Sequence, residues 1–418
     1  MSNVQNPTRR TVLSGLATVG LATAGSAALI RPARAAQVLR IGHLTDISGP
    51  YSATSGATSI ICARQAIEDF NPAAHNMQVE LIPADHQNNP DIAMGIAREW
   101  FDRGDIDAVL ELNNSAIALA MNTLTKQKNK VHLNSGAVTA ALTGPACTEN
   151  MVHWTYDSWM LAHGPSLSLT KSGYKAWYII APDYAFGVSL TQDCTRFVEA
   201  QGGKVLGVSK HPFPGVTDFS SYLLAAQASG AKVIALANGG NDIVNCMKQA
   251  REFGLPQQGI RMVALAAQTT DIHGMGLDAG QGLINTQPFY WDLNDRTRAF
   301  TKRVLPKTPD NYPSMTHAGA YSATLHYLKA AAELGVDKAK ASGRDTVAMM
   351  KRLPTDDDCF GVGSVREDGR KLHATYLFEA KSPAESKSQW DVQKVIDTIP
   401  LEQSFRPLNE GGCPLIKA

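Results

Sequence analysis

The sequence lacks the signatures of the common catalytic sites. Its 418 residues contain no G-x-S-x-G nucleophile elbow, no G-x-x-x-x-G-K-[ST] phosphate loop and no H-E-x-x-H zinc helix. The 11 histidines are scattered, and none of them stands at metal-ligand spacing. These absences predict that the protein is not an enzyme and that it uses neither a metal ion nor a cofactor.

The chain also has almost no net charge and, beyond its N-terminus, no long apolar run. There are 39 Lys and Arg residues against 38 Asp and Glu residues, so no net field attracts nucleic acid or an anionic membrane. After residue 35 no apolar run approaches the length of about 18 residues that a membrane-spanning helix needs. We therefore expect no nucleic-acid partner and no direct membrane anchor.

The N-terminus has the pattern of an export signal. Arg9 and Arg10 precede an uncharged segment rich in Ala, Gly and Thr, and Ala33-Arg34-Ala35 has the A-x-A form of a cleavage site. This layout is typical of a twin-arginine signal peptide. We expect residues 1–35 to direct export into the periplasm and then to be removed. The alternative, a transmembrane helix over residues 11–30, is disfavoured because the segment is only weakly apolar.

The cysteines permit disulfides but do not specify them. All six follow the expected cleavage site, none forms a C-x-x-C pair, and six cysteines allow fifteen pairings. Cys62, Cys194 and Cys246 lie in helical patterns, as buried small apolar residues do. Cys147 and Cys413 lie in irregular segments flanked by Pro and Gly, so we favour a disulfide between these two.

Strand patterns alternate with amphipathic helix patterns from residue 38 onward, which indicates an α/β fold with parallel strands. One series of expected strands lies at 38–46, 77–85, 107–113 and 131–134, and a second lies at 175–182, 203–210, 232–237 and 260–266. The expected helices between them are 56–71, 91–103, 115–128, 186–201, 217–229 and 241–253. The sequence therefore predicts two doubly wound parallel-sheet lobes of one topology.

No third copy of this unit follows residue 288, so the remaining chain is expected to add to the same two lobes. The expected order is 36–156 in lobe 1, 157–288 in lobe 2, 289–354 in lobe 1, 355–400 in lobe 2 and a C-terminal tail at 401–418. Several crossings between lobes form a hinge. Two open sheets that face each other can then close around a ligand at the carboxyl ends of their strands.

Small, polar and aromatic residues follow these expected strand ends and the expected first crossing. The loops offer backbone N–H and hydroxyl groups that suit a carboxylate, and aromatic rings that can cover the rest of a ligand. Any single residue also fits ordinary turn, cap or core roles. The candidate ligand-binding residues are Ser48, Tyr51, Thr54, Asn113, Asn114, Ser115, Gly136, Ala137, Val138, Thr139, Tyr156, Asp157, Tyr184, Phe186, Asn238 and Gly239.

Short sequence marks in a fixed order resemble the leucine/isoleucine/valine-binding family of periplasmic solute-binding proteins. They include Ser48-Gly49-Pro50, Tyr184-Ala185-Phe186-Gly187 and Thr217-Asp218-Phe219-Ser220, and they run from about residue 38 to 330. The resemblance implies the type I two-lobe fold, a small carboxylate ligand and the membrane permease of an ABC importer as partners. It also implies that the loops at 114–115 and 136–139 hold the ligand carboxylate.

Two positions depart from the amino-acid binders of that family. Those proteins hold the ligand ammonium with a threonine where this chain has Val138, although Thr139 follows, and with an acidic residue where this chain has no carboxylate between Leu265 and Gln268. We add Gln268 to the candidate residues. An unpaired buried ammonium is costly, so an α-amino acid is disfavoured as the ligand.

The part of the chain from Gly361 to Pro414 is similar to a subgroup associated with aromatic and other carboxylic acids. We therefore expect an aromatic or 2-oxo carboxylate as the ligand. Two alternatives remain. One is a branched-chain amino-acid-binding protein of the same importer class, and the other is a ligand-sensing receptor for a membrane signalling partner.

Overall fold

The structure is a computed structural model of the chain, and it describes residues 38–308 and 311–417. The expected signal peptide at residues 1–35 lies outside the described residues. Within the two described ranges, no helix combines the length and the apolar character that a membrane crossing requires.

The first sheet contains five parallel strands. They are β1 (Val38–Thr45), β2 (Gln78–Asp85), β3 (Ala108–Glu111), β4 (Val131–Asn134) and β5 (Met151–His153). Their order in the sheet is β2-β1-β3-β4-β5. The first four strands are joined by helices α1 (Gly56–Phe70), α2 (Pro90–Asp102) and α3 (Ser115–Lys128). Every residue of β3 and β4 is buried, as in parallel strands that helices cover on both faces.

The second sheet contains seven strands. They are β6 (Ala176–Pro182), β7 (Lys204–His211), β8 (Val233–Leu236), β9 (Arg261–Ala264), β10 (Ile284–Gln287), β13 (Thr375–Ala380) and β14 (Gln393–Ile399). Five of them run parallel in the order β7-β6-β8-β9-β10, which repeats the order of the first sheet. The expected shared topology is thus confirmed. β13 and β14 run antiparallel, so the second sheet is mixed and the expectation of a purely parallel sheet needs this correction.

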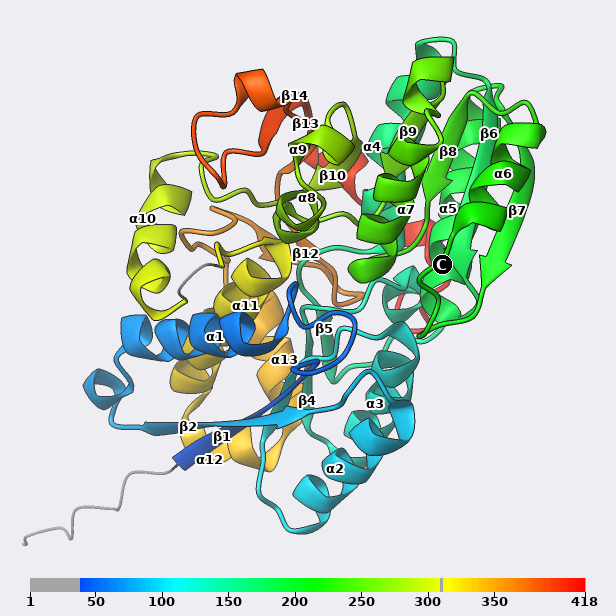
Figure 1. Cartoon of the computed structure of the whole chain (residues 1–418). Coiled ribbons are helices and arrows are strands. Elements are labelled where there is room, and N and C mark those ends of the chain that lie inside the picture. The colour runs from blue at the N-terminus through cyan, green and yellow to red at the C-terminus, as the bar shows by residue number, and fades with distance from the viewer. Residues whose placement is uncertain (1–37, 309–310, 418) are drawn as a thin grey trace, which may run out of the picture. The chain divides into compact units, whose positions relative to one another are not determined.

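The helices of the second sheet lie between its parallel strands and before β6. They are α4 (Ser158–Lys171), α5 (Ala185–Ala200), α6 (Ser220–Ala228), α7 (Asn241–Glu252), α8 (Thr269–Met275) and α9 (Leu277–Gly280). Figure 1 shows α5, α6 and α7 beside β6, β7 and β8.

After β10 the chain returns to the first sheet and then leaves it again. The returning helices are α10 (Asp295–Val304), α11 (Met315–Leu334), α12 (Val336–Ala341) and α13 (Gly343–Arg352). α11 packs along α1, and α13 packs against β4 (Figure 1). A small hairpin, β11 (Ser364–Val365) and β12 (Lys371–Leu372), precedes β13, and α14 (Leu401–Ser404) follows β14. The chain therefore crosses between the sheets three times, which makes a hinge.

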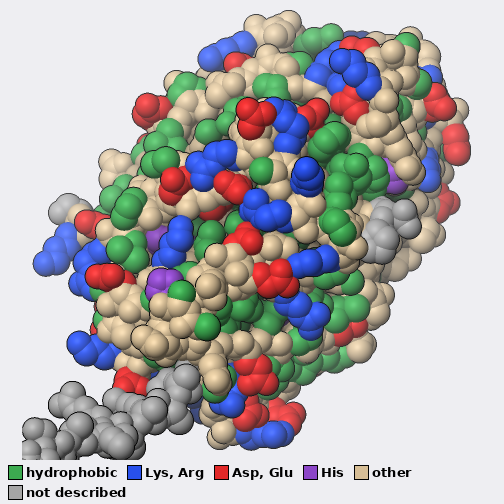
Figure 2. Space-filling view, turned by 90° about the vertical axis from the view of Figure 1, so that its left-hand side faces the viewer, with side chains coloured by type: hydrophobic (Ala, Val, Ile, Leu, Met, Phe, Trp, Pro, Cys, Tyr) green, Lys and Arg blue, Asp and Glu red, His purple; other side chains and the backbone are tan. Residues whose placement is uncertain are grey.

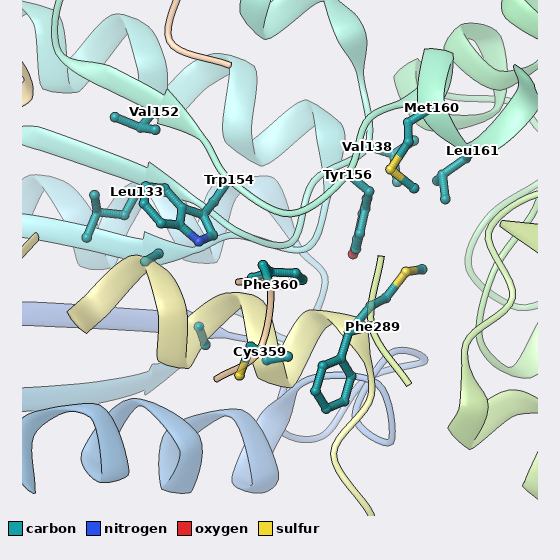
Figure 3. Packing of buried hydrophobic residues seen from close by; sticks show 14 of the residues in the cluster. Leu133, Val138, Val152, Trp154, Tyr156, Met160, Leu161, Phe289, Cys359 and Phe360 are labelled. Atoms are coloured by element: carbon teal, nitrogen blue, oxygen red, sulfur yellow. The ribbon is translucent and has the colours of Figure 1, made fainter. Parts of the chain in front are cut away.

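The hinge has an apolar interior. Trp154 and Tyr156 come from the first crossing, Phe289 from the second and Phe360 from the third, and all four belong to one buried cluster (Figure 3). On the face of the molecule in Figure 2, acidic and basic side chains are interspersed without a large area of either sign.

The C-terminal tail returns to the first lobe through a disulfide. Cys147 is bonded to Cys413, with a Cα–Cα distance of 5.5 Å, which is the pair that the sequence favoured. Cys62, Cys194, Cys246 and Cys359 are buried free thiols.

Candidate ligand-binding site

The candidate ligand-binding pocket is lined by residues from both lobes. Its empty volume, including space open to solvent, is about 420 Å³. The lining comes from loops that follow strands of both sheets and from the start of α11. The lining residues are Tyr51, Thr54, Asn113, Ser115, Gly136, Ala137, Val138, Tyr156, Tyr184, Phe186, Gly239, Gly240, Ala266, Gln268, Met315 and Thr316.

Twelve of the seventeen candidate residues are brought together in this pocket. Their contact with a ligand remains a prediction. The sequence analysis missed Gly240, Ala266, Met315 and Thr316. Gly240 and Ala266 adjoin strand ends that were already singled out, so a wider window at those ends would have included them. Met315 and Thr316 begin a helix that does not directly follow a strand. Candidates chosen at the ends of expected strands therefore could not include them.

Three of the other five candidates make contacts outside the pocket lining. Ser48 is exposed, and its hydroxyl donates to Asp85 Oδ2 at 2.6 Å. Thr139 Oγ1 lies 2.7 Å from Ser189 Oγ, so it links the two lobes beside the pocket. Asn238 is buried, and its amide donates to Cys246 Sγ at 3.6 Å.

The remaining two candidates cap helices. Asn114 Oδ1 accepts from the backbone N–H groups of residues 116 and 117 at 2.9 and 3.1 Å, which caps α3. Asp157 Oδ1 accepts from Met160 N at 2.9 Å and caps α4, and its other oxygen lies 3.6 Å from Arg370 Nη1. Both side chains satisfy free N–H groups of a first helical turn. Neither belongs to the pocket lining.

The loops after β3 and β4 form one end of the pocket. Ser115 is the first residue of α3, at the positive end of the helix dipole. Its hydroxyl oxygen accepts from Thr139 N at 3.2 Å, which leaves the hydroxyl hydrogen free to donate. A Cβ on Gly136 would lie 2.7 Å from Asn113 Cβ, so only glycine allows the two loops to approach this closely. This end offers small uncharged donors.

Aromatic residues from both lobes meet at another side of the pocket. The hydroxyls of Tyr51 and Tyr184 lie 2.9 Å apart. Phe213 stacks on both rings, with centroid distances of 5.4 Å to Tyr51 and 5.1 Å to Tyr184. Phe186 meets the Tyr51 ring edge-on at 6.4 Å. Because Tyr51 follows a strand of the first sheet and the others follow strands of the second, these contacts join the lobes across the pocket.

Burial keeps these tyrosine hydroxyls protonated. It raises the pKa of Tyr51, and it also raises the pKa of Tyr184, where the hydrogen bond with Tyr51 acts in the opposite direction. Burial likewise raises the pKa of Tyr156, whose hydroxyl donates to Gly136 O at 2.8 Å. All three hydroxyls are therefore neutral at physiological pH.

A third side of the pocket is an amide and hydroxyl network. Gln268 Oε1 accepts from Ser314 Oγ at 2.7 Å, and Gln268 Nε2 donates to Thr316 Oγ1 at 2.9 Å. Thr316 Oγ1 also lies 2.9 Å from the Tyr156 hydroxyl. These bonds connect the loop after β9 to the start of α11, and so they connect the second lobe to the first.

No lining residue is charged, and two buried acidic groups that are close in sequence to lining residues have raised pKa values. Burial raises the pKa of Asp242 to about 7. It raises that of Asp271 to about 7 as well, against the lowering effect of a hydrogen bond from Gln268 N at 2.9 Å. Within the described part of the chain, no group of three or more His, Cys, Asp or Glu side chains is placed to hold a metal ion.

Two sheets of the same strand order, three chain crossings and a pocket at the strand ends of both sheets together define a two-lobed solute-binding protein. A family model described as periplasmic binding protein matches residues 38–387. The chain belongs to the periplasmic binding protein family, as the sequence resemblance indicated. Members of this family are binding components of ABC transporters. The family implies a periplasmic location, with a small ligand and a permease as partners.

Solved structures show the same architecture. A periplasmic binding protein from Burkholderia mallei is 39% identical, with a TM-score of 0.86, and the match covers 91% of this chain and 99% of that one. A branched chain amino acid ABC transporter periplasmic ligand-binding protein from Burkholderia xenovorans LB400 is 37% identical, with a TM-score of 0.79 and coverage of 90% and 99%. A solute binding protein of an ABC transporter from R. palustris, in complex with 4-hydroxybenzoate, is 20% identical, with a TM-score of 0.77 and coverage of 87% and 97%.

Proposed function

We propose that the protein captures an aromatic or 2-oxo carboxylate between its lobes by hinge closure and delivers it to the permease of an ABC importer. The observation that carries this ligand class is the uncharged lining of the pocket. A carboxylate needs donors, and the Ser115 hydroxyl supplies one at the positive end of the α3 dipole. An α-ammonium needs a counter-charge, and without one its burial is costly.

Apolar and aromatic surface supports a ligand with an apolar body. Tyr51, Phe186, Val138 and Ala266 all line the pocket, and burying an aromatic ring against such surface contributes on the order of 4 kcal/mol by area. The R. palustris structure holds 4-hydroxybenzoate in the same fold, which is compatible with such a ligand here. The amide and hydroxyl network at Gln268 and Thr316 offers partners to a second, uncharged polar group.

Calorimetry on protein that has been unfolded, stripped of ligand and refolded tests this proposal. The panel contains benzoate, 4-hydroxybenzoate, phenylpyruvate, 4-methyl-2-oxopentanoate, phenylalanine and leucine. We expect at least one aryl or oxo acid to bind at micromolar affinity, without being chemically converted, and the amino acids to bind at least about tenfold more weakly. Leucine binding as tightly as every acid would overturn the ligand assignment.

A branched-chain amino acid is the second candidate ligand, because a 37% identical structure is described as a branched chain amino acid transporter component. In that case an acidic group must pair with the ligand ammonium, and Asp271 and Asp242 are two buried acids within three residues of the lining positions Gln268 and Gly240. This candidate predicts that Asp271→Asn or Asp242→Asn abolishes leucine binding. The carboxylate proposal predicts that both variants retain the binding of an aryl or oxo acid.

We also propose that export follows the twin-arginine route, on the strength of Arg9, Arg10 and the Ala33-Arg34-Ala35 site. Replacing both arginines by lysine is expected to leave the precursor in the cytoplasm, as read from the fractionation of the cells that express it. Unchanged processing and export of the lysine variant would contradict the route.

A further inference from the structure

Glu111 is a buried carboxylate behind the pocket. It is the last residue of β3, it is 0% exposed, and it does not belong to the pocket lining. Its carboxylate accepts from the His43 ring at 3.0 Å, from the Thr45 hydroxyl at 2.5 Å and from the Ser59 hydroxyl. These partners belong to β1 and α1, so the side chain of Glu111 is anchored to two neighbouring elements.

The carboxylate of Glu111 is ionised. Its complete burial acts to raise the pKa, but the charge interaction and hydrogen bond of His43, together with the two hydroxyl donors, outweigh burial and lower the pKa below the usual value. A charged acceptor strengthens all three hydrogen bonds. Glu111 is therefore a strong anchor inside the sheet.

The backbone at this point is strained. Glu111 has a φ of 82° and Leu112 a φ of 58°, in the left-handed region that residues other than glycine rarely adopt. Such a conformation persists only where the surrounding structure holds it. Leu112 is fully buried, and its N–H donates to Leu44 O at 3.2 Å. This turn leads directly into the loop that carries Asn113 and Ser115.

Glu111 also links the two loops at the small-donor end of the pocket. Its backbone carbonyl accepts from Gly136 N at 3.1 Å. On the other loop, Asn113 Nδ2 donates to Ser55 Oγ at 2.9 Å, and Asn113 Oδ1 lies 3.1 Å from His86 Nε2. The side chain of Glu111 is thus fixed to the body of the lobe, while its backbone sets the positions of both loops.

We propose that Glu111 is a positioning residue for ligand binding: its anchored carboxylate holds the strained turn that places Asn113, Ser115 and Gly136 at one end of the pocket. The proposal rests on the proposed function, because it assigns a purpose to the geometry of that pocket. It requires no contact between Glu111 and the ligand.

The test compares Glu111→Gln with a matched control, Asp107→Asn. Asp107 directly precedes β3, at its opposite end, and is only 4% exposed. Its carboxylate is paired with Lys130 at 3.2 Å and Lys340 at 2.8 Å, far along the strand from the pocket loops. Both substitutions keep the side-chain volume and remove a buried negative charge.

We expect Glu111→Gln to weaken the tightest-binding acid of the calorimetric panel by about tenfold or more, because an amide cannot accept from all three donors. Asp107→Asn is expected to lower the stability and to leave the affinity within about twofold. Wild-type affinity in the Glu111→Gln protein, or an equal loss in the control, would overturn the proposal.

Hydrogen exchange of the apo protein tests the role of Glu111 independently of the proposed function, because it needs no ligand. Hydrogen exchange of the apo protein is expected to become faster at amides 112–116 and at Gly136 in Glu111→Gln and to stay unchanged there in Asp107→Asn. If no acid of the panel binds the wild-type protein, the proposed function fails, and unchanged exchange at these amides still overturns the role of Glu111. Ser59→Ala removes one donor to the same carboxylate and is measured in the same way if Glu111→Gln does not fold.

Discussion

Ser115 and Asn114 are neighbours in the chain, and the structure gives their side chains different surroundings. The Ser115 side chain lines the pocket, whereas the Asn114 side chain caps α3 and donates to Asn88 Oδ1. The sequence placed both in one carboxylate-binding loop. It could not separate them, because the serine and asparagine side chains suit a ligand contact and a helix cap equally well.

This difference gives a prediction for two single substitutions. Ser115→Ala is expected to weaken carboxylate binding by about 1–3 kcal/mol, because it removes a donor, and also to lower stability, because Thr139 N loses its acceptor. Asn114→Ala is expected to lower the free energy of unfolding by about 0.5–2 kcal/mol through loss of the cap. Calorimetry and denaturant unfolding measure the two effects. Unchanged affinity in Ser115→Ala would remove that residue from the site.

The raised pKa of Asp271 makes the stability of the folded protein depend on pH. An Asp in the unfolded chain has a pKa of about 3.9, while in the folded protein burial raises it to about 7. Between these values the folded state binds a proton that the unfolded state releases, so stability decreases as the pH rises from about 4 to 7.

Asp271→Asn is expected to remove this contribution while its Oδ1 still accepts from Gln268 N. Relative to wild type, the variant should gain up to about 1.4 kcal/mol of stability for each pH unit across that window and gain nothing below pH 4. Denaturant unfolding at several pH values measures the difference. Parallel stability curves for the two proteins would contradict the raised pKa.

At the scale of elements, the sequence patterns found the parallel strands that build most of both sheets and missed the elements that the tertiary structure decides. β5 has only three residues, too few for a pattern. α4 contains Gly164 and Pro165, which argue against a helix in sequence. β13 and β14 lie within the range 355–400 that was expected in lobe 2, but their antiparallel direction was not predicted, because a sequence pattern does not give the direction of a strand in its sheet.

Close packing explains why α4 contains Gly164, a residue that disfavours a helix. A Cβ there would lie 2.6 Å from Thr286 Oγ1 and 2.8 Å from Ile399 Cδ1, so the helix approaches the second sheet where only glycine fits. Gly164→Ala is expected to lower the free energy of unfolding by about 1–3 kcal/mol. The control is Gly95→Ala in α2, where nothing lies within 4 Å of the added carbon.

Gly95→Ala is expected to raise the stability by about 0.5–1 kcal/mol, since alanine favours a helix without a new contact. Denaturant unfolding of both variants checks the pair. Equal effects of the two substitutions would show that the close approach of α4 to the second sheet has no energetic consequence.

At the scale of the whole molecule, the disulfide adds a fourth connection between the lobes. Cys147 follows β4 of the first sheet, and Cys413 lies in the tail after β14 of the second, with a separation of 266 residues. The double substitution Cys147→Ser and Cys413→Ser is expected to lower the free energy of unfolding by about 2–5 kcal/mol, because the unfolded chain gains freedom.

Reductant serves as the internal control for this prediction. It should lower the stability of the wild-type protein toward that of the double variant and leave the variant unchanged, as measured by denaturant unfolding. Equal stability of the oxidised wild type and the variant would contradict a stabilising disulfide.

The arrangement of the two lobes explains how much of the site could be predicted from the sequence. Loops at the carboxyl ends of the parallel strands face the pocket. Gly136, Phe186 and most other lining residues could therefore be predicted from the strand positions alone. Met315 and Thr316 reach the pocket only because the chain crosses back to the first lobe before α11. That placement depends on the packing of the two lobes and has no local signal.

The central claim is that uncharged dipoles hold an acid whose α-position carries no ammonium. It is tested most directly by calorimetry with two matched ligand pairs, phenylpyruvate against phenylalanine and 4-methyl-2-oxopentanoate against leucine. The two ligands of each pair have the same carbon skeleton. They differ in that the acid has an oxo group where the amino acid has its ammonium. The account predicts that the oxo acid binds more tightly in both pairs, and an amino acid that binds as tightly as its oxo acid in either pair would contradict it.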